Sequence, residues 1–283
     1  MNRFKENFAK YAFLLAACVS VIAVVLISVF LFAGGLPAIS KIGIGEFIFG
    51  DRWQPTNEFY GILPMILGSI YVTLGAIIIG VPIGILTAMY TAKFASKRTN
   101  RLFKPAINLL ASIPSVIYGF FGLVVLVPFI RDTFGGNGMS LLTASILLGI
   151  MILPTIITVS KSAILAVPGS YYEGALALGA THERTVFKVI LPAAKSGVMA
   201  GVILGIGRAI GETMAVVMVA GNQARIPADI LKGLRTLTAN IVLEMGYATD
   251  LHREALIATA VVLFIFILII NLTFSIVKRR GKL

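Results

Sequence analysis

Residues Glu173–Pro192 read EGALALGATHERTVFKVILP, a polar segment between two long apolar stretches. Ser170 and Glu173 have the spacing of a capping box, in which the two side chains close the first turn of a helix. Gly179 can adopt a positive φ and end that helix, and Thr181 can cap a second one. The pattern therefore predicts a helix, a glycine break and a second short helix, which the final proline separates from the next apolar run.

The apolar side chains of this segment are suited to two different roles. They can fill a groove on another protein, or they can lie in the membrane interface as in an ordinary amphipathic helix. The residue pattern favours neither role. The side chains concerned are Leu176, Leu178, Val186 and Phe187.

The composition indicates a membrane protein. The chain has 283 residues, of which 58% are hydrophobic and 13% charged, whereas soluble domains carry about 25% charged residues. The apolar residues form blocks of roughly 20 residues or more, enough to cross a hydrocarbon core of about 30 Å. We therefore expect an all-α polytopic membrane protein. The predicted spans are residues 11–34, 64–91, 106–131, 140–165, 194–221 and 254–277.

The distribution of charge predicts the orientation of these spans. The N-terminus, residues 92–105, residues 166–193 and the C-terminal tail with Lys282 are basic, while most acidic residues lie in the other connections. Basic loops stay in the cytoplasm, so both termini and the 166–193 loop are expected there. This also explains the net charge of +12 without nucleic acid, because no continuous basic face with aromatic residues is present.

The chain divides into two predicted regions. Residues 1–63 comprise the first membrane helix and an external segment rich in aromatic residues, which we expect at the headgroup level. Residues 64–283 form the core that contains the 166–193 loop. In the second long external loop, residues 222–253, a landing surface for a soluble partner and a plain solvated loop remain equally open.

Charged residues inside the fifth span mark a candidate site. Gly197, Gly201 and Gly205 form a stripe that allows close helix packing in lipid. Arg208 and Glu212 continue this stripe and lie four residues apart, so they can pair on one helix face. Charges inside a membrane are expensive and usually line a pathway or pair with one another. Both a substrate pathway and a self-neutralised structural ion pair fit this pattern.

The third span contains a second candidate, the string Ser112-Ile113-Pro114-Ser115. Proline removes a backbone donor, and the freed carbonyl groups must find partners in the protein or in cavity water. Such a break can bind a small anion through hydroxyls and exposed N–H groups, although a membrane proline often only kinks a helix.

Several enzymatic signatures are absent from the sequence. It has no Gly-x-x-x-x-Gly-Lys-Ser/Thr phosphate loop. His182 and His252 lie outside the predicted spans, and Cys18 is the only cysteine. We therefore predict no catalytic residue, no cofactor and no metal site.

The polar segment resembles the EAA loop of bacterial ABC importer permeases, which reads Glu-Ala-Ala, three residues, Gly, nine residues and Ile-x-Leu-Pro. Gly174 and Val189 depart from that pattern. The resemblance implies that this loop docks the chain onto a separate ATPase and that the fold is that of a type I importer permease with six transmembrane helices. The matching positions are Glu173, Ala175, Gly179, Leu191 and Pro192.

Other strings resemble the phosphate-specific branch of these permeases, particularly its C-type subunit. They are WQPTNEF at 53–59, VPIG at 81–84, SIPSVIYG at 112–119 and RAIGETM at 208–214. The resemblance implies a phosphate pathway that contains Arg208 and Glu212, together with Thr213, Ser112 and Ser115. It also implies a heterodimer with a second permease, two ATP-binding subunits and an extracytoplasmic phosphate-binding protein.

Other functions remain open at this stage. A permease for another oxyanion, such as sulfate or molybdate, or for another small solute belongs to the same class. A secondary transporter would need an ion-coupling site and would leave the EAA loop unexplained. An intramembrane hydrolase is disfavoured by the lack of a histidine or an acidic pair inside the spans.

Overall fold

Long apolar helices dominate the fold, which confirms the all-α membrane prediction. The structure is a computed structural model that describes residues 3–280. Five of its helices are long and apolar enough to cross a membrane, or six if a helix pair bent by 71° counts as one span. The two termini are predicted to be basic and cytoplasmic. Of these, residues 1–2 and 281–283, which include Lys282, lie outside the described residues.

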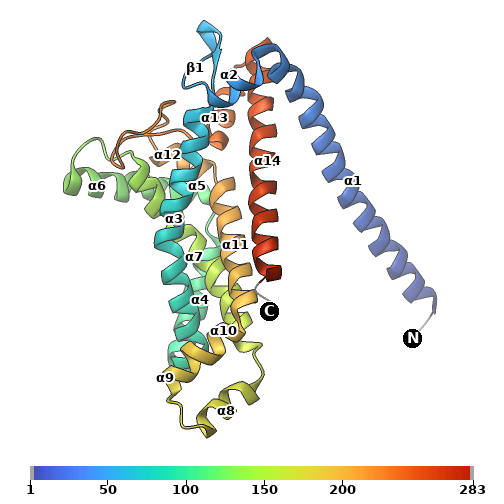
Figure 1. Cartoon of the computed structure of the whole chain (residues 1–283), viewed down its shortest axis with the longest axis vertical. Helices are drawn as coiled ribbons and strands as arrows, with labels where there is room; N and C mark the ends of the chain where they lie inside the picture. The colour runs from blue at the N-terminus through green and yellow to red at the C-terminus, as the bar shows by residue number, and fades with distance from the viewer. Residues whose placement is uncertain (1–2, 281–283) are drawn as a thin grey trace.

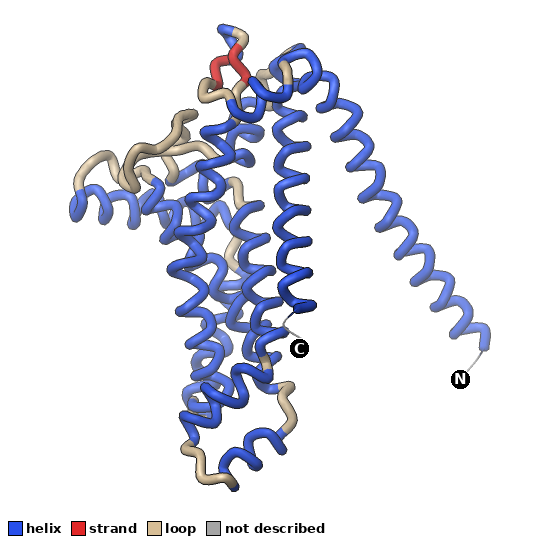
Figure 2. Tube along the Cα trace, in the orientation of Figure 1, coloured by secondary structure: helices blue, strands red, loops and turns tan. Residues whose placement is uncertain are grey.

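The elements follow one another along the chain as shown in Figures 1 and 2. The first half contains α1 (Arg3–Ile42), α2 (Ile44–Phe49), β1 (Trp53–Gln54), the 3-10 turn η1 (Pro55–Asn57), β2 (Phe59–Tyr60), α3 (Leu63–Met89), the π-helical turn η2 (Tyr90–Phe94), α4 (Lys97–Ser112), α5 (Ser115–Phe121), the π-helical turn η3 (Gly122–Leu126) and α6 (Val127–Phe134). The second half contains α7 (Leu141–Leu165), α8 (Gly169–Ala177), α9 (His182–Thr185), the π-helical turn η4 (Val186–Ile190), α10 (Leu191–Ala193), α11 (Lys195–Gly211), α12 (Met214–Val219), α13 (Leu237–Glu244) and α14 (Asp250–Arg280).

Helices α3, α7 and α11 pack closely because glycines replace side chains where they meet. A methyl group on Gly84 of α3 would come within 2.7 Å of Ile156 Cγ2, and one on Gly205 of α11 within 2.9 Å of Ile156 Cγ1. Ile156, on α7, is fully buried between them. Near the start of α11, Gly197 faces Ala163 of α7. The glycine stripe predicted in the fifth span is therefore a packing surface, as expected for helices in lipid.

The third predicted span, 106–131, is not one continuous helix. Helix α4 ends at Ser112, Ile113 and Pro114 are extended, and α5 begins at Ser115. The break arises because Pro114 disfavours helical geometry in the residue before it. The membrane-length apolar stretch is Ser115–Phe134, and its last part, α6, projects sideways from the long axis (Figure 1).

The fifth predicted span, 194–221, is also interrupted. Helix α11 ends at Gly211, Glu212 has an extended backbone, and α12 begins at Met214. At its other end α11 meets the preceding helical segment at the 71° bend. The breaks at Ile113–Pro114 and at Glu212–Thr213 both fall on strings that the sequence marked as candidate pathway.

The aromatic segment after α1 is packed more tightly than expected. Phe47, Trp53 and Tyr60 are buried, although Phe49 and Phe59 are exposed. A short antiparallel hairpin pairs Trp53 with Tyr60. The three buried rings form a protein core with α13 and α14, whereas the headgroup-level location of this segment stays a prediction.

Candidate functional site

The predicted helix–glycine–helix loop is present at one end of the molecule (Figure 1). Gly179 has φ +82, and a Cβ at this position would meet nothing within 4 Å, so backbone conformation alone selects glycine here. Thr181 caps α9, since its Oγ1 accepts the Arg184 N–H at 3.3 Å. The pKa of the Glu183 carboxyl lies below its ordinary value because its own backbone N–H and the Thr181 hydroxyl donate to it. A negative charge therefore occupies the first turn of α9.

The expected capping box at Ser170 was wrong. Helix α8 begins at Gly169, its N-cap is the extended Pro168, and no side chain caps it. Ser170 therefore lies inside the first turn, where its hydroxyl is not positioned to accept from the N3 amide. Glu173 is exposed to solvent on this helix.

The loop presents apolar side chains to the outside. No residue of α8 is buried, and Leu178 is 91% exposed, with Leu176 and Phe187 also exposed. Val186 differs from the expectation, because it is fully buried in the core beneath the loop. Of the family-type positions, Ala175 and Leu191 are half-buried while Pro192 is exposed. An exposed apolar tip on a solvated loop suits the groove of a second protein.

The break between α4 and α5 is closed from within the chain. Pro114 has no N–H, so the Leu110 carbonyl lacks its helical donor. The Tyr118 hydroxyl donates to this carbonyl at 2.8 Å instead. Ser112 is exposed, and its hydroxyl donates a hydrogen bond to Asn108 O at 2.8 Å. Ser115 is half-buried at the start of α5.

The break between α11 and α12 is closed in a similar way. The Glu212 carboxylate caps α12, because Oε1 accepts the Ala215 N–H at 3.1 Å. Thr238 Oγ1, from the distant α13, donates to the Glu212 carbonyl at 3.1 Å. Thr213, in the break, donates to Gly211 O at 3.3 Å. All freed groups named here therefore have partners, as a membrane interior requires.

The expected pair between Arg208 and Glu212 was wrong. The helix ends before Glu212, so the two side chains do not share a continuous helix face. Among the side chains of residues 6–273, none forms an ion pair or hydrogen bond with Arg208. The residue is half-exposed, and its guanidinium carries five N–H donors that a ligand could use.

The two breaks lie in one region of the fold. A methyl group on Gly119 of α5 would come within 2.9 Å of Ala215 Cα of α12, so the helices after each break pack together. The structure thus brings the candidate pathway residues Arg208, Glu212 and Thr213 near the α4–α5 break. The loop residues 173–192 lie apart from them, at the end of the molecule (Figure 1).

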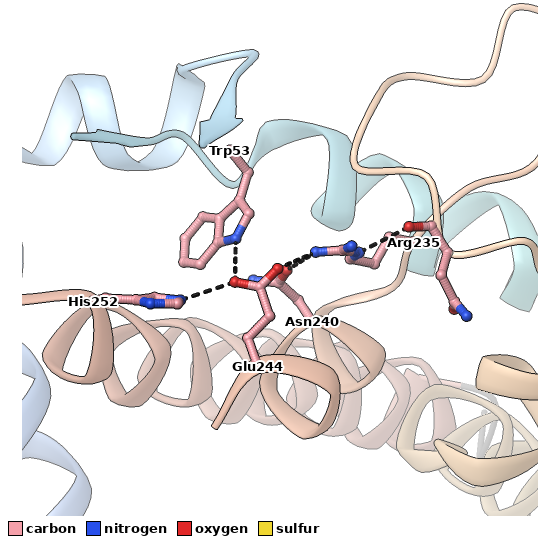
Figure 3. A network of polar contacts seen from close by, with 6 residues as sticks. Trp53, Arg235, Asn240, Glu244 and His252 are labelled. Carbon is pink, nitrogen blue, oxygen red and sulfur yellow. Dashed lines mark hydrogen bonds and ion pairs between the residues drawn. The ribbon is translucent and has the colours of Figure 1, made fainter. Parts of the chain in front are cut away.

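A buried polar network in the external part escaped the sequence analysis (Figure 3). Glu244 is 7% exposed and accepts from Trp53 Nε1 at 2.9 Å and from Arg235 Nη1 at 2.5 Å. His252 Nε2 lies 2.8 Å from the same carboxylate, and Arg235 also donates to Asn240 at 3.0 Å. The 222–253 segment is therefore packed and cross-linked to the hairpin, not a plain solvated loop. Sequence reasoning missed it because Trp53 lies 191 residues from Glu244 in the chain and no helical periodicity connects the other members.

Comparison with known proteins identifies the family. A family model described as "Binding-protein-dependent transport system inner membrane component" matches residues 80–282. The chain belongs to this family. It is a multi-pass inner-membrane component of such a transport system, and its fold is that of an ABC importer permease.

Relatives of this permease carry transport names. It is 41% identical to the "Probable ABC transporter permease protein YqgH" of Bacillus subtilis, over 90% of this chain and 86% of that one. It is 36% identical to the "Phosphate transport system permease protein PstC" of Mesorhizobium japonicum, over 86% of this chain and 81% of that one.

Solved structures confirm the fold of the permease. A bacterial alginate ABC transporter, in complex with its pentasaccharide-bound periplasmic protein, aligns with TM-score 0.66 and 16% identity, over 99% of this chain and 98% of that one. The inward-facing MetNI methionine ABC transporter aligns with TM-score 0.60 and 22% identity, over 81% of this chain and 99% of that one.

The role of Glu212 as a helix cap can be tested apart from its charge. Glu212→Ala removes the acceptor for the Ala215 N–H and should lower stability by about 1 kcal/mol, the usual effect of losing a cap. Glu212→Gln retains a side-chain oxygen acceptor and should cost less. Thermal unfolding of the purified protein in detergent measures both. Equal losses for the two variants would show that the carboxylate charge, and not the cap, is what matters.

Proposed function

We propose that this chain is the permease subunit of an ATP-driven phosphate importer. The observation that carries the proposal is the guanidinium of Arg208, which lies in a membrane-spanning helix without a partner among the described residues. Such a charge is costly in a membrane unless it faces a pathway or a counter-charge. A planar fork of donors suits phosphate oxygens, and several relatives of this chain are named phosphate permeases.

A second permease subunit is part of this proposal. Arg208 is half-exposed, and it cannot face lipid at low cost, since an arginine at the bilayer centre costs about 2.5–3.5 kcal/mol. Three apolar side chains of α5, the helix that follows the other break, are exposed as well: Val116, Ile117 and Phe120. A homologous permease packed against this face, forming a heterodimer, would enclose Arg208 in a pathway between the two subunits.

ATP hydrolysis belongs to other subunits in this proposal. The chain lacks a phosphate-binding loop in its sequence, and the exposed tip of the 166–193 loop suits docking onto one of the two ATP-binding subunits of the complex. An extracytoplasmic phosphate-binding protein would deliver substrate to the opposite end. Closure of the ATPases would switch the pathway between its two openings through the loop residues Glu173, Ala175, Gly179, Leu191 and Pro192.

The regions 1–63 and 64–283 are proposed as an N-terminal addition and a permease core. The family match begins at residue 80, which supports this division. The addition is not independent, because Phe47 and Trp53 share a core with Leu237 and Leu256.

The pathway role of Arg208 predicts a specific loss. Arg208→Ala should reduce phosphate uptake at least about 10-fold, the effect of removing a charged hydrogen-bond donor, while assembly and ATP hydrolysis persist. Arg208→Lys should restore only part of the uptake, because an ammonium lacks the planar fork. Labelled phosphate uptake into proteoliposomes that contain the whole complex measures this effect.

Competition in the same assay identifies the anion. Sulfate and molybdate should compete poorly with labelled phosphate, whereas arsenate, which has the same shape and charge, should compete well. Strong competition by sulfate would favour the second candidate, a permease for another oxyanion. Uptake driven by an ion gradient without ATP would contradict an importer of this class.

The loop predicts a coupling defect at Gly179. Gly179→Val forces a β-branched residue into the left-handed region at a cost of about 1 kcal/mol or more and should misplace α8. Co-purification of the ATP-binding subunits and uptake should both fall. Gly174→Val on the same loop is the control, since Gly174 is also open to space but does not have a positive φ. Normal uptake by both Gly179→Val and Glu173→Ala would refute the assigned role.

The cytoplasmic location of both termini and of the 166–193 loop is tested by labelling. Leu178→Cys and Ile230→Cys, each in a Cys18→Ser background, place one exposed thiol at each end of the molecule. An impermeant thiol reagent added to intact cells should label position 230 and not position 178. The reverse pattern would invert the proposed topology.

A further inference from the structure

We propose that His182 is a positioning residue that links the docking helix α8 to membrane helix α3, so that a movement of α8 shifts the pathway. This inference rests on the proposed function of the 166–193 loop. It concerns one side chain that the family-type pattern of that loop does not include.

The imidazole of His182 lies between two aromatic rings from different elements. On one side, the Tyr172 hydroxyl of α8 lies 2.7 Å from His182 Nδ1. On the other side, the Phe94 ring packs edge-on, with ring centroids 4.6 Å apart and an interplanar angle of 71°. Phe94 is the last residue of η2, the π-helical turn that ends α3. The histidine is thus the bridge from α8 to α3.

Helix α8 has few other attachments to the body of the protein. It contains no buried residue, its end is broken at Gly179, and only residues 166–168 separate it from α7. Lys93, also in η2, places its Nζ 5.7 Å from the Tyr172 ring centroid. Both polar contacts of the Tyr172 side chain therefore lead to the same turn of α3, directly or through His182, and the side chain also packs on the buried cluster that contains Ala88 and Met89 of α3.

The residues after His182 provide a firm base. Val186 and Ile190 of η4 are buried with Ala88 and Met89 of α3. With this base beneath α9, the Tyr172–His182 contact gives a movement of α8 a route to α3, in addition to the packing of Tyr172 on the same buried cluster. The movement reaches α3 at a π-helical turn, where a wider hydrogen-bond pattern interrupts the α-helix. From α3 it would pass to α7 through the contacts at the glycines.

The contact does not depend on the charge of the histidine. The neutral ring with its proton on Nε2 accepts from the Tyr172 hydroxyl, whereas the protonated ring donates from Nδ1 to the hydroxyl oxygen. Coupling is therefore tested by substitution and not by pH.

The experiment measures the amount of substrate taken up per ATP hydrolysed by the whole complex in proteoliposomes. Tyr172→Phe removes only the hydroxyl and should lower this ratio up to about 5-fold, which corresponds to one hydrogen bond of about 1 kcal/mol. His182→Ala removes both contacts and should lower it further, with normal co-purification of the ATP-binding subunits. Tyr11→Phe is the matched control and should leave the ratio unchanged, because Tyr11 is 67% exposed on α1, outside the loop and the permease core.

Two outcomes overturn the proposal. One is a normal ratio in His182→Ala. The other is a parallel fall in co-purification, hydrolysis and uptake in His182→Phe as well as in His182→Ala, which indicates a merely structural role. If His182→Ala does not assemble, His182→Phe keeps a ring against Phe94 and should match Tyr172→Phe, with no added loss when the two are combined. Additive losses would overturn the link.

A distance measurement separates this inference from the substrate assignment. Spin labels at Leu178→Cys and Leu86→Cys, both exposed positions, report on the docking loop and α3. In a Cys18→Ser background, the distance between them should stay constant on ATP binding with His182 present and change in His182→Ala. A constant distance in both proteins would overturn the link, whatever anion the complex transports.

Discussion

Every backbone N–H and C=O group of this protein that lies in lipid must find its partner inside the protein. The two helix breaks make this constraint visible. At the α4–α5 break the Tyr118 hydroxyl replaces the donor that Pro114 lacks. At the α11–α12 break the Glu212 carboxylate and the Thr238 hydroxyl satisfy groups that a continuous helix would have paired. Irregular backbone at this depth is possible only because side chains from other elements close it, and the candidate pathway is built on that irregular backbone.

Close packing around α7 holds these breaks in place. Ile156 occupies the space that Gly84 and Gly205 leave on two neighbouring helices. This one side chain therefore sets the position of both α3 and α11 along α7. Without a hydrophobic drive between helices in lipid, such contacts must come from close fit. The break at Glu212 follows directly from helix α11, and its position is therefore set by the same contacts.

The two ends of the molecule differ in how firmly they are held. At the end that holds the hairpin, Glu244 joins the hairpin, α13 and α14 through Trp53, Arg235 and His252 (Figure 3). These donors hold the three elements together, because a buried charge left without a partner costs about 3–5 kcal/mol. At the other end, α8 has no buried residue and presents Leu178 outward. One end of the protein is therefore cross-linked and the other carries a loosely attached helix. This difference suits the proposed function, in which an ATPase binds at α8.

The amino-acid sequence alone determined the features that depend on local pattern. Apolar blocks predicted the membrane helices, Gly179 the left-handed break, Thr181 the cap of α9, and the stripe of Gly197 and Gly205 a packing face. The family of the chain followed from the spacing of residues within one loop. Each of these follows from neighbours in the chain or from helical periodicity, which a sequence displays directly.

Only the tertiary structure decided which side chains meet. Four-residue spacing suggested that Arg208 pairs with Glu212, but the helix ends between them and Glu212 caps α12 instead. Trp53 and Glu244 are 191 residues apart and share a hydrogen bond. His182, at the start of α9, packs against Phe94, at the end of η2. The physical reason is that a broken helix loses the periodicity on which such predictions rest, and contacts between distant segments depend on packing that no local pattern records.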